Sequence, residues 1–106
     1  LNDEVVISRN AWAKHFPDSS KMFIEVNTSV SLSDLYRGLI VQSGNDASVA
    51  IAEHVAGSES GFVSLMNSWA AKLELSNTAF TNPHGLDSDG LYSTPYDIAK
   101  LGQAII

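Results

Sequence analysis

The stretch Gly38-Leu39-Ile40-Val41-Gln42-Ser43-Gly44-Asn45-Asp46-Ala47 joins two segments whose apolar residues repeat at helical spacing. The stripe before the polar turn consists of Leu32, Leu35, Tyr36, Leu39 and Ile40. The stripe after it consists of Ala47, Ala50, Ile51, His54 and Val55. Gly44 and Asn45 are residues that interrupt a helix. The sequence therefore predicts two amphipathic helices separated by a short polar turn.

Residues that start and stop helices flank these stripes. Ser31 can cap the first helix, with Asp34 three residues later as a short variant of the capping box. Asp46 begins the second helix, and Gly57 stands where a left-handed C-terminal cap is expected. Ser58 can then cap a third helix.

The third helix has an apolar stripe three turns long, which we expect to be buried in the core. This stripe consists of Phe62, Leu65, Met66, Trp69, Ala70 and Leu73. Residues 76–93 are rich in Asn, Asp, Gly and Pro and are predicted to be irregular. A fourth helix opens with Thr94 as N-cap and Pro95 at the first helical position. Its expected buried face consists of Ile98, Leu101 and Ile105.

The N-terminal region has β-strand character. Val5–Ile7 and Met22–Val26 are rich in β-branched and apolar residues, which predicts a pair of strands. The polar segment between them, Ser8–Lys21, is too long for a tight turn and is expected to form a surface loop. The fold class is therefore predicted as mainly α with a short β-strand pair. We expect residues 1–30 to hold the strand pair and its loop, and residues 31–106 to form a helical subdomain.

Composition narrows the classes of function. The 106 residues include 12 acidic and 6 basic side chains, a formal net charge of −6. Nucleic-acid binding is not expected, because it requires a basic face. There is no cysteine, so thiolate chemistry and Cys-based metal sites are excluded. The sequence has no apolar run of about eighteen residues, as a membrane-spanning helix would require.

The tripeptide Ser43-Gly44-Asn45 is the strongest candidate for a functional site. A junction between two helices can hold a hydroxyl and an amide in a cleft, where they can relay a proton and bind a substrate carbonyl. A purely structural interpretation stays open, in which Asn45 or Asp46 caps the next helix. The Ser-x-Asn pattern is short, and it occurs a second time at Ser8-Arg9-Asn10.

Several segments, in order along the chain, resemble the low-molecular-mass penicillin-binding proteins, and above all their D-alanyl-D-alanine carboxypeptidase branch. These segments are Gly38–Ala47, Phe62–Asn67, Leu75–Phe80, His84–Asp87 and Ser93–Thr94. The resemblance covers essentially the whole chain. It implies that the chain is a helical subdomain of the α+β fold shared by penicillin-binding proteins and β-lactamases.

The resemblance also implies a mechanism, serine acyl transfer on peptidoglycan stem peptides that end in D-Ala-D-Ala. Ser43 would relay a proton toward the leaving D-Ala, and Asn45 would donate its side-chain amide to the bound peptide's carbonyl. β-Lactam antibiotics would acylate the same enzyme. No cofactor or metal is expected. The family implies a periplasmic location, associated with the inner membrane.

Two motifs of that family are absent from this sequence. No S-x-x-K is present, because Ala11, Asp18, Trp69 and Asp97 stand three residues before the four lysines. No K-T-G is present either. The chain begins in a predicted strand and ends in a predicted helix. We therefore expect it to be an internal fragment that needs the remainder of the parent catalytic domain, and to be inactive alone.

Three alternatives remain open at this stage. An endopeptidase or a class A β-lactamase would share the superfamily, although the latter usually has Asp in the middle of its S-x-N motif. The third alternative is a non-catalytic helical module that binds a partner through an exposed apolar stripe.

His84 is a weaker substrate-binding candidate. By the resemblance, its segment lies near the active site. It can equally order its own loop through a hydrogen bond to the backbone or to Asp87. The nearby Asp87-Ser88-Asp89-Gly90 lacks the further acidic positions of a calcium loop and predicts no metal site.

Overall fold

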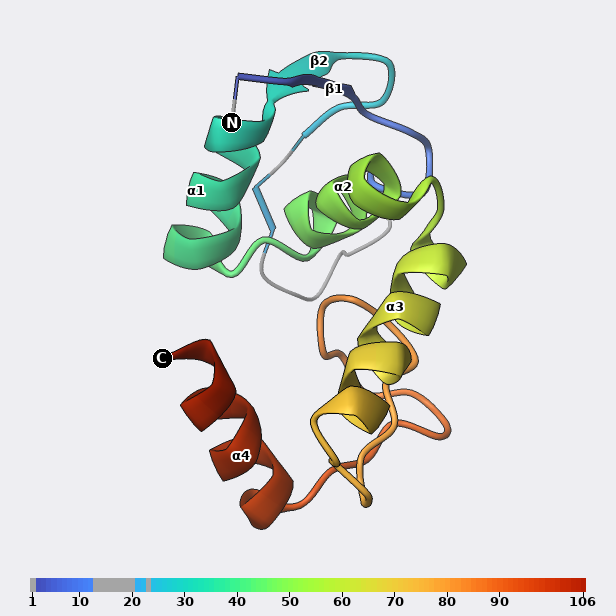
Figure 1. The fold of residues 1–106 in the computed structure, drawn as a ribbon. Helices are drawn as coiled ribbons and strands as arrows, with labels where there is room; N and C mark the ends of the chain where they lie inside the picture. The colour runs from blue at the N-terminus through green and yellow to red at the C-terminus, as the bar shows by residue number, and fades with distance from the viewer. Residues whose placement is uncertain (1, 13–20, 23) are drawn as a thin grey trace.

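A computed structural model describes residues 2–12, 21–22 and 24–106 of the chain. In those residues two short strands precede four helices (Figure 1). The elements are β1 (Glu4–Val6), β2 (Ser29–Ser31), α1 (Leu32–Gln42), α2 (Asn45–Ala56), α3 (Glu59–Lys72) and α4 (Pro95–Ile105). The strands form an antiparallel sheet that pairs Val5 with Val30. The predicted fold class, mainly α with a short strand pair, is confirmed.

Helix α2 forms the centre of the described fold. It packs against α1, α3 and β1, and every residue from Asn45 to Ala52 is buried. Much of this run is Ala and Ser, and small side chains allow neighbouring elements to approach closely. The core around it consists of Val5, Ile7, Ala11, Ile24, Leu32, Leu35, Ala47, Val49, Ala50 and Ile51. Burial of a side chain the size of Leu35 contributes roughly 1.5–3 kcal/mol.

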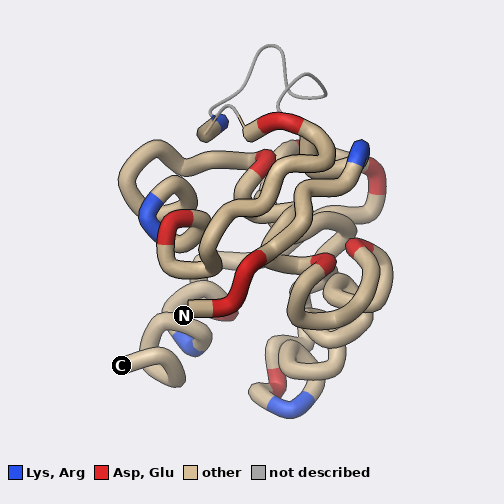
Figure 2. The backbone as a smooth tube through the Cα atoms, turned by 90° about the horizontal axis from the view of Figure 1, so that it is seen from above, with Lys and Arg blue, Asp and Glu red and all other residues tan. Residues whose placement is uncertain are grey.

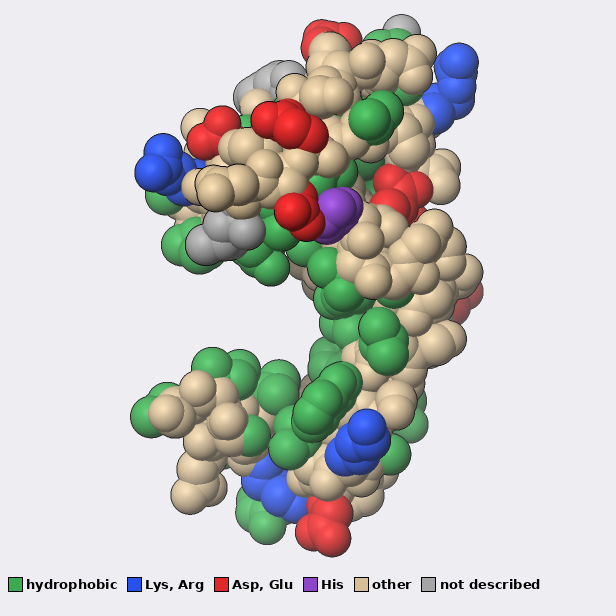
Figure 3. All heavy atoms as spheres, turned by 45° about the horizontal axis from the view of Figure 1, so that its top comes forward, with side chains coloured by type: hydrophobic (Ala, Val, Ile, Leu, Met, Phe, Trp, Pro, Cys, Tyr) green, Lys and Arg blue, Asp and Glu red, His purple; other side chains and the backbone are tan. Residues whose placement is uncertain are grey.

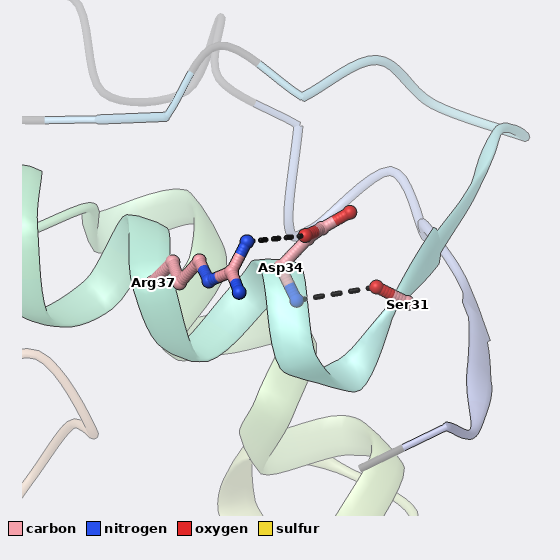
Figure 4. A network of polar contacts seen from close by, with 3 residues as sticks. All are labelled: Ser31, Asp34 and Arg37. Atoms are coloured by element: carbon pink, nitrogen blue, oxygen red, sulfur yellow. Dashed lines mark hydrogen bonds and ion pairs between the residues drawn. The ribbon is translucent and has the colours of Figure 1, made fainter.

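The predicted N-cap of α1 is confirmed (Figure 4). The Asp34 backbone amide donates to Ser31 Oγ over 3.2 Å, which satisfies one of the free amides of the first helical turn. Asp34 also lies 3.9 Å from the Arg37 guanidinium. Both side chains are well exposed, so water screens this ion pair and it adds little stability.

Three further predicted helix ends are confirmed, but the second helix begins at Asn45 and not at Asp46, with Gly44 as an N-cap that has no side-chain hydrogen bond. Gly57 ends α2 with φ 83°, in the left-handed region that glycine enters without penalty. Ser58 Oγ accepts from the Gly61 amide at the start of α3, over 2.9 Å. Thr94 Oγ1 accepts from the Asp97 amide over 3.1 Å, and Pro95 occupies the first position of α4.

The prediction of the second strand was wrong. The strand that pairs with β1 is Ser29–Ser31 and not Met22–Val26, in which Met22 and Ile24–Val26 are described and none is in a strand. The amides of Met22 and Ile24 donate instead to the Asp46 carboxylate, which takes the place of a neighbouring strand. Phe23 lies outside the described residues. Residues 13–20 of the predicted loop Ser8–Lys21 lie outside them as well.

The burial predicted for several stripe residues was also wrong. Trp69 is 57% exposed and Ile105 is 76% exposed, and Leu65 and Ile98 are exposed too. Helical spacing shows which face of a helix is apolar, but burial also requires an element that covers this face. In the described part of the chain, α4 packs extensively against no other helix or strand. Its buried residue is Asp97.

Acidic and basic residues are interspersed in the part of the chain that the structure describes. Figure 2 shows the described Lys and Arg residues spread along the chain and separated by acidic ones. The whole sequence carries a formal net charge of −6.

Candidate active site

The turn between α1 and α2 holds the Ser-Gly-Asn tripeptide in an unusual backbone conformation. Ser43 ends α1 with φ 51° and ψ 44°, in the left-handed region. This conformation costs a residue with a Cβ atom about 1–2 kcal/mol. The Gly44 amide donates to Gly38 O over 3.1 Å, and Gly44 O accepts from the Ser48 amide over 3.0 Å. The backbone thus reverses within one residue and starts α2 at once.

The turn places its two predicted site residues in different environments. Ser43 is exposed, whereas Asn45, the first residue of α2, is 7% exposed. The tripeptide therefore presents a hydroxyl-bearing residue to solvent and anchors the amide-bearing residue in the core. The sequence predicted that Ser43 and Asn45 lie in one turn between two helices. It did not predict the left-handed conformation of Ser43.

Position 44 requires glycine because the surrounding atoms leave too little space for a side chain. Its φ of −65° is open to any residue. A Cβ atom at this position would lie 3.2 Å from Asp46 Oδ1, from Gly38 O and from Met22 N. These separations are tighter than ordinary van der Waals contacts, and two of the three atoms belong to the backbone. The turn therefore packs directly against the segment around Met22.

A buried carboxylate next to the turn was missed as a functional candidate by the sequence analysis, which considered Asp46 only as a helix cap. Asp46 is completely buried. Its Oδ1 accepts from the Met22 amide over 2.7 Å and from the Ala47 amide over 2.9 Å, and its Oδ2 accepts from the Ile24 amide over 3.1 Å. Hydrogen bonds to a charged group contribute roughly 1.5–3 kcal/mol each. An Asp within an otherwise small and apolar run was the available signal.

The loop that contains His84 is ordered by a second buried side chain. Asn82 Oδ1 accepts from the His84 and Gly85 amides over 3.2 and 2.6 Å, and its Nδ2 donates to Leu86 O over 2.7 Å. His84 Nδ1 accepts from the Leu86 amide over 3.2 Å. The loop-ordering backbone bond allowed by the sequence is therefore present. This bond puts the proton of a neutral His84 on Nε2.

Burial lowers the pKa of the His84 imidazole below its ordinary value of 6.5, and the negative charge of Glu59 opposes this effect in part. A charged imidazole loses hydration in this half-buried position. His84 is thus neutral over a wider pH range than an exposed histidine.

The His84 loop is tied to the helix that begins at the turn. Ser48 Oγ, in the first turn of α2, donates to Pro83 O over 2.8 Å. A cavity of about 400 Å³ beside His84 also includes Phe80 and Tyr92, and neither Ser43 nor Asn45 lines it. The described structure therefore links the two predicted site segments through α2, but it does not bring them into this one cavity.

Within residues 2–12, 21–22 and 24–106, no group of three or more His, Asp or Glu side chains is arranged to hold a metal ion. None of the helices in that part of the chain has the length and apolarity needed to span a bilayer.

The helices and the strand pair together resemble part of solved penicillin-binding protein structures. The crystal structure of penicillin binding protein 5 from Haemophilus influenzae superposes with a TM-score of 0.93 and 52% sequence identity, over 98% of this chain and 30% of that one. Residues 1–106 match the D-alanyl-D-alanine carboxypeptidase family, peptidase S11, and the chain belongs to this family.

Curated relatives show the same similarity. D-alanyl-D-alanine carboxypeptidase DacA of Haemophilus influenzae is 53% identical over 98% of this chain. DacC of Escherichia coli is 49% identical over 100% of it. The chain spans about a quarter of the length of these relatives, 26% and 27% respectively.

Proposed function

We propose that this chain is part of a serine-type D-Ala-D-Ala carboxypeptidase that removes the terminal D-Ala from peptidoglycan stem peptides. The whole enzyme would work through an acyl-enzyme intermediate, which divides a difficult cleavage into acylation and deacylation. β-Lactams would acylate it as mimics of D-Ala-D-Ala. Its proposed location is the periplasm, in association with the inner membrane. Family membership over all 106 residues supports this function over that of a class A β-lactamase or a non-catalytic module.

The observation that carries the proposal is the backbone of the Ser43-Gly44-Asn45 turn. Strained left-handed residues persist where the surrounding structure holds them, and they cluster at functional sites. Ser43 is such a residue, and it is exposed beside a buried Asn45. In the proposed mechanism Ser43 relays a proton to the leaving D-Ala, and the Asn45 amide donates to the peptide carbonyl.

The nucleophile and its lysine would come from another part of the enzyme, because the 106 residues contain no S-x-x-K. Within this chain we propose a division near residue 30, between residues 1–30, with the strand pair and the segment beside the site, and a helical subdomain over residues 31–106. The last residue of β2, Ser31, lies just past this division. The remainder of the catalytic domain would complete the cleft. His84 is a further proposed contact at its rim.

The test is the Ser43→Ala substitution in the full-length protein that contains this segment. Release of D-Ala from a peptide ending in D-Ala-D-Ala would be measured, together with labelling by a fluorescent penicillin. Loss of a positioned proton relay is expected to slow turnover about 10²–10⁴-fold.

Ser68→Ala is the matched control, since Ser68 is exposed on α3, away from the turn. It should leave turnover within about twofold of wild type, as is usual for exposed surface substitutions. Near-normal turnover of Ser43→Ala would remove Ser43 from the mechanism, and a wild-type protein that neither releases D-Ala nor binds penicillin would overturn the proposed function.

A further inference from the structure

The Asp46 carboxylate joins two segments that lie more than twenty residues apart in the sequence. One of its oxygens accepts from Met22 N and from Ala47 N, and the other accepts from Ile24 N. The amides at 22 and 24 belong to the N-terminal segment, and the amide at 47 belongs to the first turn of α2. A single buried group therefore holds the start of α2 against the N-terminal segment.

The carboxylate is suited to this position for two physical reasons. A buried charge is costly unless several hydrogen bonds compensate it, and three backbone amides do so here. The N-terminus of a helix also favours a negative charge, and Asp46 is the second residue of α2. The neutral side chain of the same size, Asn, would lose the negative charge and one of the two acceptor oxygens.

The carboxylate also lies directly against the candidate site. A Cβ atom on Gly44 would be 3.2 Å from Asp46 Oδ1 and 3.2 Å from Met22 N. Gly44, the Asp46 carboxylate and the Met22 backbone are thus packed with less room between them than an added methyl group needs. A shift of the carboxylate would have to move the turn.

We propose that Asp46 is a positioning residue of the active site, one that fixes the Ser43-Gly44-Asn45 turn against the backbone amides of Met22 and Ile24. It touches no reacting atom. It acts through the turn, by setting where the Ser43 hydroxyl and the Asn45 amide lie during acyl transfer. This inference rests on the function proposed above for the whole enzyme.

Asp97 offers a matched control within the same chain. It is 2% exposed, and its Oδ2 accepts from the Asn77 amide over 2.9 Å and from Thr78 Oγ1 over 2.7 Å. It stands in the first turn of α4, as Asp46 does in α2. Its partners belong to the 76–94 segment and not to the Ser-Gly-Asn turn, so it should matter for folding alone.

The experiment compares Asp46→Asn with Asp97→Asn in the full-length protein. Asn keeps the size of the side chain but turns an amino group toward amides that need an acceptor. Both variants should melt at a lower temperature than wild type. Acylation and deacylation by a fluorescent penicillin are then timed well below both melting temperatures, where both variants are folded.

The expected result is that Asp46→Asn slows acylation about 10- to 100-fold, since a small displacement of a reacting group has an effect of this size. Asp97→Asn should stay within about twofold of wild type. The proposal is overturned if Asp46→Asn is acylated at the wild-type rate, or if Asp97→Asn is slowed equally.

The experiment also distinguishes a folding defect of the variants from a failure of the proposed function. If Asp46→Asn does not fold, Asp46→Ser is measured in its place, because Ser keeps one acceptor for these amides. If neither variant folds, Asp46 is assigned to folding alone and the proposal is overturned. A wild-type enzyme that penicillin does not acylate would contradict the proposed function instead of the role of Asp46.

Discussion

At the scale of single residues, His84 both orders its loop and makes the stability of the fold depend on pH. Its Nδ1 accepts from the Leu86 amide, and burial holds the pKa of its imidazole below the ordinary value. The unfolded chain therefore binds a proton more readily than the folded one. Stability contributed by neutral His84 is complete above a pH of about 6.5, and it is lost as the pH falls from there toward the lowered folded pKa.

The loss of stability toward low pH should disappear in the variant His84→Asn. Asn carries an acceptor oxygen near the position of Nδ1 but does not titrate. Between about pH 7.5 and pH 5, the melting temperature of the wild-type protein should fall more steeply than that of the variant. Thermal melts of both proteins over this range provide the measurement. Parallel curves would show that His84 binds protons equally in the folded and unfolded states.

At the scale of elements, the junction between α1 and α2 depends on the absence of a side chain at Gly44. The Gly44→Ala methyl group would meet two backbone atoms and the Asp46 carboxylate at 3.2 Å. Overpacking of this kind typically costs about 1–3 kcal/mol. We expect a lower denaturation midpoint for this variant, measured by urea unfolding.

Gly102→Ala is its control. Gly102 lies inside α4, and a Cβ atom there would meet nothing within 4 Å. Ala is favoured over Gly within a helix by roughly 0.5–1 kcal/mol, so this variant should be unchanged or more stable. A Gly44→Ala protein as stable as Gly102→Ala would mean that the turn can relax without cost.

The elements also differ in how well the sequence predicted them. The caps at Ser31, Ser58 and Thr94 act through residues three positions away, so local sequence contains all that their prediction requires. The segment 22–26 has the composition of a strand, but the acceptor for its amides is Asp46. Composition predicts an extended backbone; it does not identify which distant group the backbone will bind.

At the scale of the whole molecule, the described chain leaves large apolar surfaces uncovered. Figure 3 shows hydrophobic side chains on both sides of the hollow between the α4 end and the rest of the molecule. An apolar cavity of about 370 Å³ lies among α3, Leu75, Phe80 and Leu101. Exposed apolar patches of this kind mark surfaces that another chain segment or protein covers.

Two properties of the isolated 106-residue chain follow. It should bind a hydrophobic dye and elute from a sizing column ahead of a monomer, because Trp69 and Ile105 are exposed. It should also show no covalent penicillin labelling, since the proposed mechanism takes its nucleophile from outside these 106 residues. The full-length protein, run in parallel, is expected to elute without self-association and to be labelled.

Sizing chromatography, dye fluorescence and gel detection of a fluorescent penicillin check both properties. A monomeric isolated chain that binds no dye would show that the exposed stripes are tolerated in water. Covalent labelling of the isolated chain would place an acylated residue within these 106 positions, contrary to the proposed mechanism.

Local sequence was enough to predict the four helices, the caps at Ser31, Ser58 and Thr94, and the irregular segment, because each depends on residues close together along the chain. It also predicted Ser43 and Asn45 as site candidates. The pairing of Ser29–Ser31 with β1, the exposure of Trp69 and the contacts of Asp46 with Met22 and Ile24 became known from the folded structure alone. These features depend on which distant groups meet in space, and periodicity along the chain contains no such information.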